Sequence, residues 1–317
     1  MRKVLILLGP TGVGKTGVSI LLARALDTEI ISADSMQIYR YMDIGTAKPS
    51  PEERSIVRHH MIDIVDPREA YSTGKYIEGV VPIIERLHKE DKIPIIVGGT
   101  GLYIKAMTRG IFCGPSADWR LRETLLSMER EEEGSLHNYL KELDPEAAGK
   151  ITFKDIRRTI RALEVCLKSN STMSEMQRKL TQPFPYDFIK IGFLRDRKEL
   201  YGMIEKRVDK MIGCGLVGEV RKILEMNPGR TPMQAIGYKE ITMFLRGEID
   251  LEDAVRLIKR GTKRYAKRQF TWFRKEEGIH WIDITGVHDS NEIFRFLQHS
   301  LEGLLSCDIM EKYFVVN

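Results

Sequence analysis

Residues 5–20, "LILLGPTGVGKTGVSI", decide how the N-terminal part of this chain folds. The stretch reads as an apolar strand, a glycine-rich turn and the start of a helix, and the turn matches the pattern G-x-x-x-x-G-K-[ST]. Glycines let backbone N–H groups curl around an anion at a helix N-terminus, where unpaired donors and the helix dipole favour negative charge. The pattern predicts a phosphate-binding loop made of Gly9, Pro10, Thr11, Gly12, Val13, Gly14, Lys15 and Thr16.

Two side chains of this loop have distinct expected roles. Lys15 should reach the outer phosphate, and the hydroxyl of Thr16 should reach Mg²⁺. The alternative is a strand-to-helix turn that binds no ligand. The loop by itself does not say which phosphate compound it would bind, or for what purpose.

The composition is that of an ordinary globular protein. The chain has 317 residues, of which 42% are hydrophobic, so it can bury a large core and should form about two domains. The apolar run after the basic N-terminus stops at Gly9, too early for a signal peptide, and no other stretch approaches a membrane span. Four scattered cysteines argue against zinc and disulfides and favour a reducing cytoplasm: Cys113, Cys166, Cys214 and Cys307.

Charge is distributed unevenly along the chain. The net charge is only +5, yet residues 254–275 contain no acidic side chain. Several basic residues there lie three or four positions apart, which gathers them on one side of a helix, with aromatic residues nearby. Such a face suits a nucleic-acid backbone, and the alternative is a solvated Lys/Arg helix. The basic residues are Arg256, Lys259, Arg260, Lys263, Arg264, Lys267, Arg268, Arg274 and Lys275.

The order of the elements predicts an α/β fold. Short β-rich runs at 4–8, 29–33, 60–65 and 93–99 alternate with helical patterns at 15–26 and 74–90, which is typical of βαβ units and a parallel sheet. Further strands are expected at 186–194 and 279–285. Further helical patterns occupy 198–226, 232–246, 250–275 and the tail from about Asn291.

A different composition marks an insertion in this pattern. Residues 117–182 are charged and helix-periodic, with turns at Gly134, Asp144-Pro145 and Gly149. The predicted fold is therefore a P-loop NTPase-like parallel sheet flanked by helices, with an inserted all-helical domain. The expected boundaries are 1–115 and 185–317 for the α/β core, and 116–184 for the insertion.

Functional residues of such a fold come from the carboxyl ends of its strands. Asp34, Asp66 and Thr100 each follow a predicted strand. An ordinary ATPase or GTPase would end a strand in an acidic residue that holds Mg²⁺. Here the strand at 93–99 ends in Gly98-Gly99-Thr100-Gly101 and offers a hydroxyl where an acid would be expected.

Seven stretches, in the same order from the first strand to Arg274, together resemble the tRNA dimethylallyltransferase family. Two of them, "ISADSMQIYRYMDIGTAKP" (31–49) and "YAKRQFTWFR" (265–274), contain motifs far more specific than a bare phosphate-binding loop, notably "DSMQIYRYMDIGTAKP" and "AKRQFTWFR". The others are "GPTGVGKT" (9–16), "HHMIDIVDPREAYS" (59–72), "IVGGTGLYIKAM" (96–107), "DIRRTIRALEV" (155–165) and "QAIGYKE" (234–240).

The resemblance implies prenyl transfer to tRNA. Dimethylallyl diphosphate would donate its five-carbon group to N6 of the adenine on the 3′ side of the anticodon, giving N6-isopentenyladenosine and diphosphate. The loop over 9–16, with Mg²⁺ held partly by Thr16, would grip the leaving diphosphate, because donors and cations at those oxygens stabilise the transition state. Arg207 resembles a family arginine near the diphosphate. Many relatives carry a basic residue where this chain has Met203, so this part of the match departs from the family.

The resemblance also implies a base and a tRNA surface. Adenine N6 is a weak nucleophile, and Asp34 is the expected acceptor of its proton; the alternatives are that Asp34 caps a turn or binds Mg²⁺ through water. Thr100 would hydrogen-bond a diphosphate oxygen, or it is part of an ordinary turn. The adenine must leave its stack to reach a buried base. The expected tRNA contacts are Asp34, Ser35, Met36, Gln37, Thr100, Arg122, Arg157, Arg158, Thr159, Ile160 and Arg161.

Two other functions compete with prenyl transfer. A P-loop kinase would use bound ATP, but the strand that ends in Gly98-Gly99-Thr100 has no acid for Mg²⁺, and no arginine-rich lid is evident. A non-catalytic RNA-binding switch would tolerate the loss of Asp34. The sequence leaves open which tRNAs are modified, the donor range, the Mg²⁺ stoichiometry, the pH optimum and the role of the C-terminal tail. A monomer is the default expectation.

Overall fold

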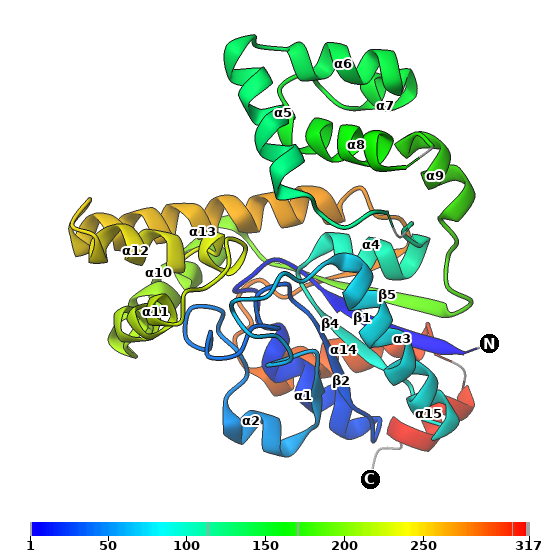
Figure 1. Cartoon of the computed structure of the whole chain (residues 1–317). Helices are drawn as coiled ribbons and strands as arrows, with labels where there is room; N and C mark the ends of the chain where they lie inside the picture. Colours follow the sequence, from blue (N-terminus) through cyan, green and yellow to red (C-terminus); the bar gives the residue numbers. More distant parts are fainter. Residues whose placement is uncertain (1, 113, 170, 306, 315–317) are drawn as a thin grey trace. The chain divides into compact units, whose positions relative to one another are not determined.

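The sheet that carries the strand ends is entirely parallel. The computed structural model describes residues 2–112, 114–169, 171–305 and 307–314. Within these residues, six strands form one sheet in the order β3-β2-β4-β1-β5-β6 (Figure 1). The expected α/β fold is confirmed. The strands are β1 (Lys3–Leu8), β2 (Ile30–Ala33), β3 (His59–His60), β4 (Ile95–Gly98), β5 (Asp187–Leu194) and β6 (Ile279–Asp283).

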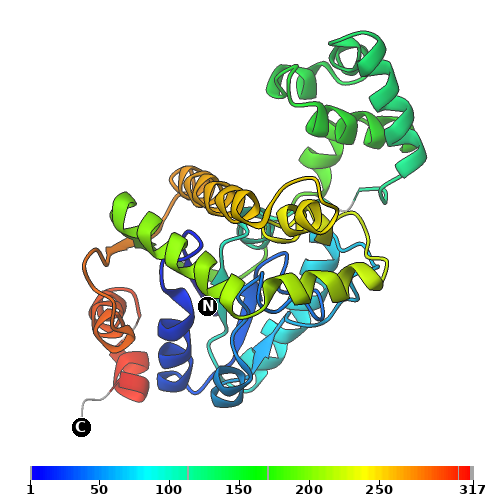
Figure 2. The same ribbon diagram turned by 90° about the vertical axis from the view of Figure 1, so that its left-hand side faces the viewer.

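Helices cover both faces of this sheet. On one face, α1 (Lys15–Ala25) and α14 (Ser290–Glu302) contribute Val18, Leu22, Leu297 and Leu301 to a core shared with the strands. On the opposite side of the strands lies α3 (Thr73–Lys89), whose buried residues include Tyr76, Val80 and Ile84 (Figure 2). Because both faces are covered, the strands are apolar on both sides: Val4 to Leu8 are all at most 1% exposed.

A second apolar core holds the helices that follow β5. It joins α10 (Arg197–Gly213), α11 (Leu216–Glu225), α12 (Tyr238–Leu245) and α13 (Leu251–Phe273) to the loop after β2. Val208, Val220, Tyr238 and Ile258 lie at its centre and are at most 2% exposed. Outside the inserted helical segment, the other described elements are α2 (Pro51–Ile56), α4 (Gly101–Arg109), the short 3₁₀ helix η1 (Pro232–Gln234) and α15 (Cys307–Phe314).

The chain divides into two compact units. The first contains residues 1–104 and 185–317 and holds the whole sheet; the second contains residues 105–184. The expected boundary was residue 116, whereas the division falls at Lys105, inside α4.

The second unit is built from helices around its own core. Leu125, Leu136, Leu140, Ile160 and Leu163 pack together there, each at most 6% exposed. Within the described residues, its helices after α4 are α5 (Trp119–Glu131), α6 (Ser135–Leu143), α7 (Pro145–Lys150), α8 (Ile156–Lys168) and α9 (Met173–Leu180).

Two predicted elements differ from the structure. The strand expected at 60–65 ends at His60, because Met61 and Asp63 adopt left-handed backbone conformations with φ of 61° and 57°. The helical stretch 198–226 is two helices, since Gly215 has φ of 97° and begins α11.

Two further expectations concern the bilayer and the cysteines. No described helix combines the length and the apolar character that a bilayer crossing requires. Cys166 and Cys214 carry free thiols, and Cys113 lies outside the described residues.

Candidate active site

The glycine-rich loop forms the turn between β1 and α1. Gly12 and Gly14 have φ of 83° and 110°, a region that side chains rarely tolerate, and Gly14 is the first residue before α1. The Lys15 ammonium lies over the loop and donates to the carbonyls of Gly9 and Pro10, both at 2.9 Å. The sequence thus places a lysine and a helix N-terminus at the carboxyl end of the central strand, as an anion site requires.

Lys15 and Arg207 bring two cations to the same pocket. Burial, together with the charge of Arg207, lowers the pKa of Lys15 to about 7, although Asp34 opposes this shift. Burial also lowers the pKa of the Arg207 guanidinium, again against the charge of Asp34. A guanidinium keeps its proton at any physiological pH. Burial and mutual repulsion therefore destabilise the charged forms of Lys15 and Arg207, and a bound anion would stabilise both.

Asp34 and Thr100 stand at the ends of neighbouring strands. Asp34 follows β2 and Thr100 follows β4, and these strands pair in register at Ala33 and Gly98. The Thr100 N–H donates to the carbonyl of Ala33 at 3.1 Å, and the Thr100 hydroxyl accepts from the backbone of Ser35 at 3.0 Å. Asp34 Oδ1 accepts from the N–H groups of Met36 and Gln37 at 2.8 and 3.3 Å. Asp34 thus caps a turn, one of the two alternatives to a base.

One pocket of about 340 Å³ in the first unit collects most of these groups. Asp34 and Gln37 line it, as do Arg207 and Met203. From the phosphate-binding loop it includes Thr11, Gly12, Gly14, Lys15 and Thr16, whereas Val13 is fully buried. The neighbouring strand end contributes Gly98 and Gly99. The Asp34 carboxylate, the Thr16 hydroxyl and two cations therefore share one cavity at the carboxyl edge of the sheet, whereas Thr100 is not among the residues that line it.

Two residues of α13 join this site and were not expected to. Gln269, which is 7% exposed, accepts from the Thr11 N–H and donates to the carbonyl of Gly99, both at 2.9 Å. Tyr265 lies within hydrogen-bonding reach of Thr100 and Gln269, and burial and the charge of Asp34 raise its pKa to about 12. Both residues lie in the stretch "YAKRQFTWFR", so the family motif carried the signal that residue types alone did not.

The exposed face of α13 is less strongly basic than its sequence predicts. Lys259 pairs with Asp209 at 2.6 Å and Lys263 pairs with Glu205, both acids from α10. Acidic residues missing from the segment itself are thus supplied by a neighbouring helix. Exposed cations for which the described residues offer no ion pair are Arg260, Arg264, Lys267 and Arg268.

In the second unit, the expected tRNA residues fall into two groups. Arg157 and Arg158 are exposed near the start of α8, and Arg158 pairs with Asp155 at 3.2 Å. Thr159 and Ile160 are 1% and 6% exposed, so their side chains lie inside this unit. Contacts from these residues to tRNA stay a prediction.

The other two arginines expected to contact tRNA, Arg122 and Arg161, surround a buried acid. Glu164 is fully buried and accepts two hydrogen bonds from Arg122, at 2.9 and 2.7 Å, and one from Arg161 at 2.5 Å. Burial would raise the pKa of Glu164, but the hydrogen bonds from Arg122, the Asp118 N–H and Arg161 hold it below its usual value. Two arginines around one carboxylate leave one net positive charge at this place.

The chain is similar to known transferases that act on tRNA. The family model described as IPP transferase matches residues 37–276. A tRNA dimethylallyltransferase of Thermodesulfovibrio yellowstonii is 56% identical over 96% of this chain and 99% of its own length. One from Syntrophobacter fumaroxidans is 47% identical over 90% of this chain and 84% of its own length.

Solved structures agree in fold. A full-length tRNA isopentenylpyrophosphate transferase from Bacillus halodurans is 39% identical, with a TM-score of 0.70, over 96% of this chain and 98% of its own. A eukaryotic dimethylallyltransferase acting on tRNA is 29% identical, with a TM-score of 0.82, over 96% of this chain and 80% of its own.

Proposed function

The chain belongs to the IPP transferase family, and we propose that it transfers the dimethylallyl group of dimethylallyl diphosphate to adenine N6 beside the anticodon of tRNA. The adenine is the one on the 3′ side of the anticodon, and the products are N6-isopentenyladenosine and free diphosphate. The observation that carries the proposal is that a carboxylate, Asp34, shares one cavity with a phosphate-binding loop.

The diphosphate is assigned to the loop end of the pocket. Breaking the allylic C–O bond sends its electron pair onto the leaving diphosphate, so groups that bind anions lower the barrier. Lys15, Arg207 and the N–H donors at the start of α1 can bind the diphosphate oxygens in this way. The Thr11 N–H is already paired with Gln269, so we assign it a role in shaping the loop.

Asp34 is assigned the proton of the adenine amine. As N6 forms its bond to the allylic carbon, it must lose a proton, and a carboxylate within hydrogen-bonding reach accepts it. Two backbone N–H groups hold Oδ1 of Asp34, which fixes the direction of the carboxylate. The turn-capping and base roles are compatible, because a carboxylate has a second oxygen.

Mg²⁺ is the proposed cofactor, and the residues present fit it. The Thr16 hydroxyl lines the pocket and is an oxygen ligand, which this ion prefers. The described residues hold no group of three or more His, Cys, Asp or Glu that could bind a metal. Mg²⁺ commonly takes most of its ligands from phosphate oxygens and water. When bound, it would neutralise charge on the diphosphate.

The tRNA is assigned to basic groups of both units. Arg260, Arg264, Lys267 and Arg268 of α13 can neutralise backbone phosphates, and Arg157 and Arg158 present further cations on α8. Ser35, Met36 and Gln37 follow Asp34 directly and are proposed to meet the anticodon loop there. We also propose a monomer in the cytoplasm; the scattered cysteines support the location.

A transfer assay tests this function. Purified protein is mixed with Mg²⁺, unmodified tRNA and labelled dimethylallyl diphosphate, and a parallel reaction contains ATP. We expect label in tRNA, and a loss on the order of a hundredfold or more for Asp34→Asn. Asp34→Asn should bind pyrophosphate at least as tightly as the wild type, because it removes a negative charge from the pocket. ADP formation without label in tRNA would support a kinase instead.

A further inference from the structure

The loop that carries Asp34 has little regular structure of its own. Residues 34–49 run from the end of β2 to the start of α2 without a described helix or strand. Loops of this kind are usually the mobile parts of a protein. Yet Asp34, Gln37, Thr46, Ala47 and Pro49 all line the pocket. Something must therefore hold this loop in place.

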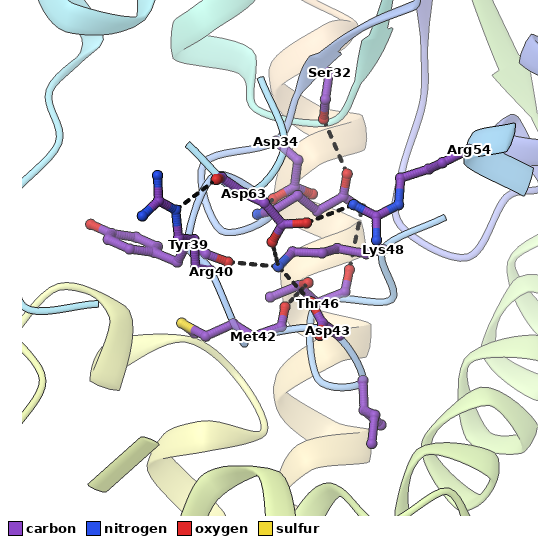
Figure 3. Close-up of polar contacts among 12 residues, drawn as sticks. Ser32, Asp34, Tyr39, Arg40, Met42, Asp43, Thr46, Lys48, Arg54 and Asp63 are labelled. Carbon is purple, nitrogen blue, oxygen red and sulfur yellow. Dashed lines mark hydrogen bonds and ion pairs between the residues drawn. The ribbon is translucent and has the colours of Figure 1, made fainter. Parts of the chain in front are cut away.

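Lys48 is the buried cation at the centre of the loop (Figure 3). Its side chain is 2% exposed, and its ammonium donates to the Tyr39 carbonyl at 2.6 Å, to Asp43 at 2.7 Å and to Asp63 at 2.5 Å. An ammonium has three donors, and here each has a partner. Lys48 thus ties three separate points of the chain together.

The partners of Lys48 are themselves fixed. Asp63 accepts from Arg54 at 2.6 Å, and its carbonyl accepts from Arg40 at 3.0 Å. Burial would raise the pKa of Asp63, but the hydrogen bonds and charges of Lys48 and Arg54 hold it below its usual value. Asp63 is therefore ionised at neutral pH. A buried ammonium without this partner would be left uncompensated.

Backbone conformation shows that the loop is held under strain. Tyr41, Ala47, Met61 and Asp63 have φ of 67°, 47°, 61° and 57°. Non-glycine residues rarely adopt such values, and they persist where the surrounding contacts determine them. All four lie in the two segments that Lys48 joins.

Glu219 fastens the other side of the loop. Its carboxylate, from α11, accepts from three successive N–H groups, those of Asp43, Ile44 and Gly45, at 2.9, 2.7 and 3.0 Å. The Tyr238 hydroxyl donates to the same carboxylate. The segment 43–48 is thus held at one end by Glu219 and at the other by Lys48.

Gln37 connects this segment to the carboxylate. Its Nε2 donates to the carbonyls of Thr46 and Ala47, both at 3.3 Å, and its Oε1 accepts from Ser32 at 3.1 Å. Its backbone N–H donates to Asp34 Oδ1. A shift of residues 46–47 would therefore move Gln37 and, with it, the turn that aims Asp34.

We propose that Lys48 is a positioning residue for the transfer reaction, which fixes the Asp34 carboxylate by holding residues 43–48 against Tyr39 and Asp63. The role rests on the proposed function, because it concerns the group that accepts the N6 proton. It predicts that loss of Lys48 lowers the rate of the chemical step. Binding of diphosphate should change little, since the Lys48 ammonium donates to Tyr39, Asp43 and Asp63, all of which lie outside the loop from Gly9 to Thr16.

The test compares Lys48→Met with Lys190→Met. Lys190 forms a similarly buried ion pair with Glu276, at 3.0 Å, and does not line the described pocket. The Tm of each variant is measured first. The single-turnover transfer rate at saturating substrates and the Kd for pyrophosphate are then measured well below the lowest Tm. We expect Lys48→Met to lose roughly tenfold to a hundredfold in rate, with an unchanged Kd. Lys190→Met should lower the Tm and keep the rate.

Each outcome decides the proposal. A wild-type rate in Lys48→Met overturns it, and so does an equal loss of rate and of pyrophosphate binding, which indicates general unfolding. If Lys48→Met does not fold, Glu219→Gln replaces it, since it weakens the other attachment of residues 43–48. A wild-type rate there would also overturn the proposal. Absence of transfer by the wild-type protein would instead refute the proposed function.

Discussion

Gln269 Oε1 accepts the Thr11 N–H at 2.9 Å, and this bond joins the phosphate-binding loop to α13. The same side chain donates to the carbonyl of Gly99 at 2.9 Å. One buried amide thus fixes the spacing between two strand ends that face the pocket. The glycine at 99 leaves room for it, because a Cβ there would lie 2.2 Å from Gln269 Nε2.

Replacing Gln269 should therefore affect both folding and binding. Gln269→Leu keeps most of the volume and leaves a buried N–H and a carbonyl unpaired, so the free energy of unfolding should fall by about 1–3 kcal/mol. Pyrophosphate should also bind more weakly, because the loop at Thr11 loses its tether. Denaturant unfolding and calorimetry measure the two effects. Thr271→Ala, at an exposed position on the same helix, should change neither.

Diphosphate binding should weaken as the pH rises through the pKa of Lys15. Burial lowers this pKa to about 7, so free Lys15 is largely neutral above that pH. A bound anion favours the charged form and raises the pKa. Pyrophosphate binding at pH 8 should therefore take up a proton, and its Kd should rise by at most about tenfold per pH unit.

Calorimetry in buffers with different ionisation enthalpies measures this proton uptake. Lys15→Met is the reference, because pyrophosphate itself titrates in this range and the difference between the two proteins isolates Lys15. The same proton uptake in both proteins would contradict the assignment.

Acidic pH should lower the stability of the second unit, because Glu164 becomes protonated. Its pKa lies below the usual value in the folded state, so its contribution to stability is complete above the unfolded pKa of about 4.5 and is lost as the pH falls through the folded pKa. Hydrogen exchange in the full chain should show weaker protection of α5 and α8 at acid pH. Glu164→Gln should weaken this protection at pH 7 as well, by about 1–3 kcal/mol, because Arg122 and Arg161 lose a charged partner. The exposed Glu131→Gln should leave it unchanged.

Gly98 should tolerate no side chain. A Cβ there would lie 2.3 Å from the carbonyl oxygen of Ala33, and this contact is between paired backbones that cannot move aside. Gly98→Ala should lower the free energy of unfolding by about 1–3 kcal/mol and slow transfer, because Asp34 and Thr100 follow these two strands. Gly202→Ala is the control. It lies within α10 with no atom near the new Cβ, and should be neutral or stabilising by roughly 0.5–1 kcal/mol.

Sequence motifs and the alternation of strands and helices predicted the features that depend on residues close together in the chain. The phosphate-binding loop, the strand ends and the places of Asp34 and Thr100 follow from a motif and from alternating β and α segments. The Lys48 network could not be predicted in this way, because Asp63 lies fifteen residues away and meets Lys48 only through the fold. Similarly, the acids that neutralise Lys259 and Lys263 come from α10, which no periodicity within 254–275 reveals.

α13 also has a consequence for the order of events on the enzyme. Its 23 residues form one continuous helix that exposes Arg264 and Lys267 and buries Gln269 beside the phosphate-binding loop. If RNA binding tilts this helix, Gln269 shifts the Thr11 backbone to which it is hydrogen-bonded. Conversely, a ligand that moves Thr11 shifts Gln269 and the helix. The two affinities are then reciprocally linked, so each substrate should change the affinity for the other by the same factor.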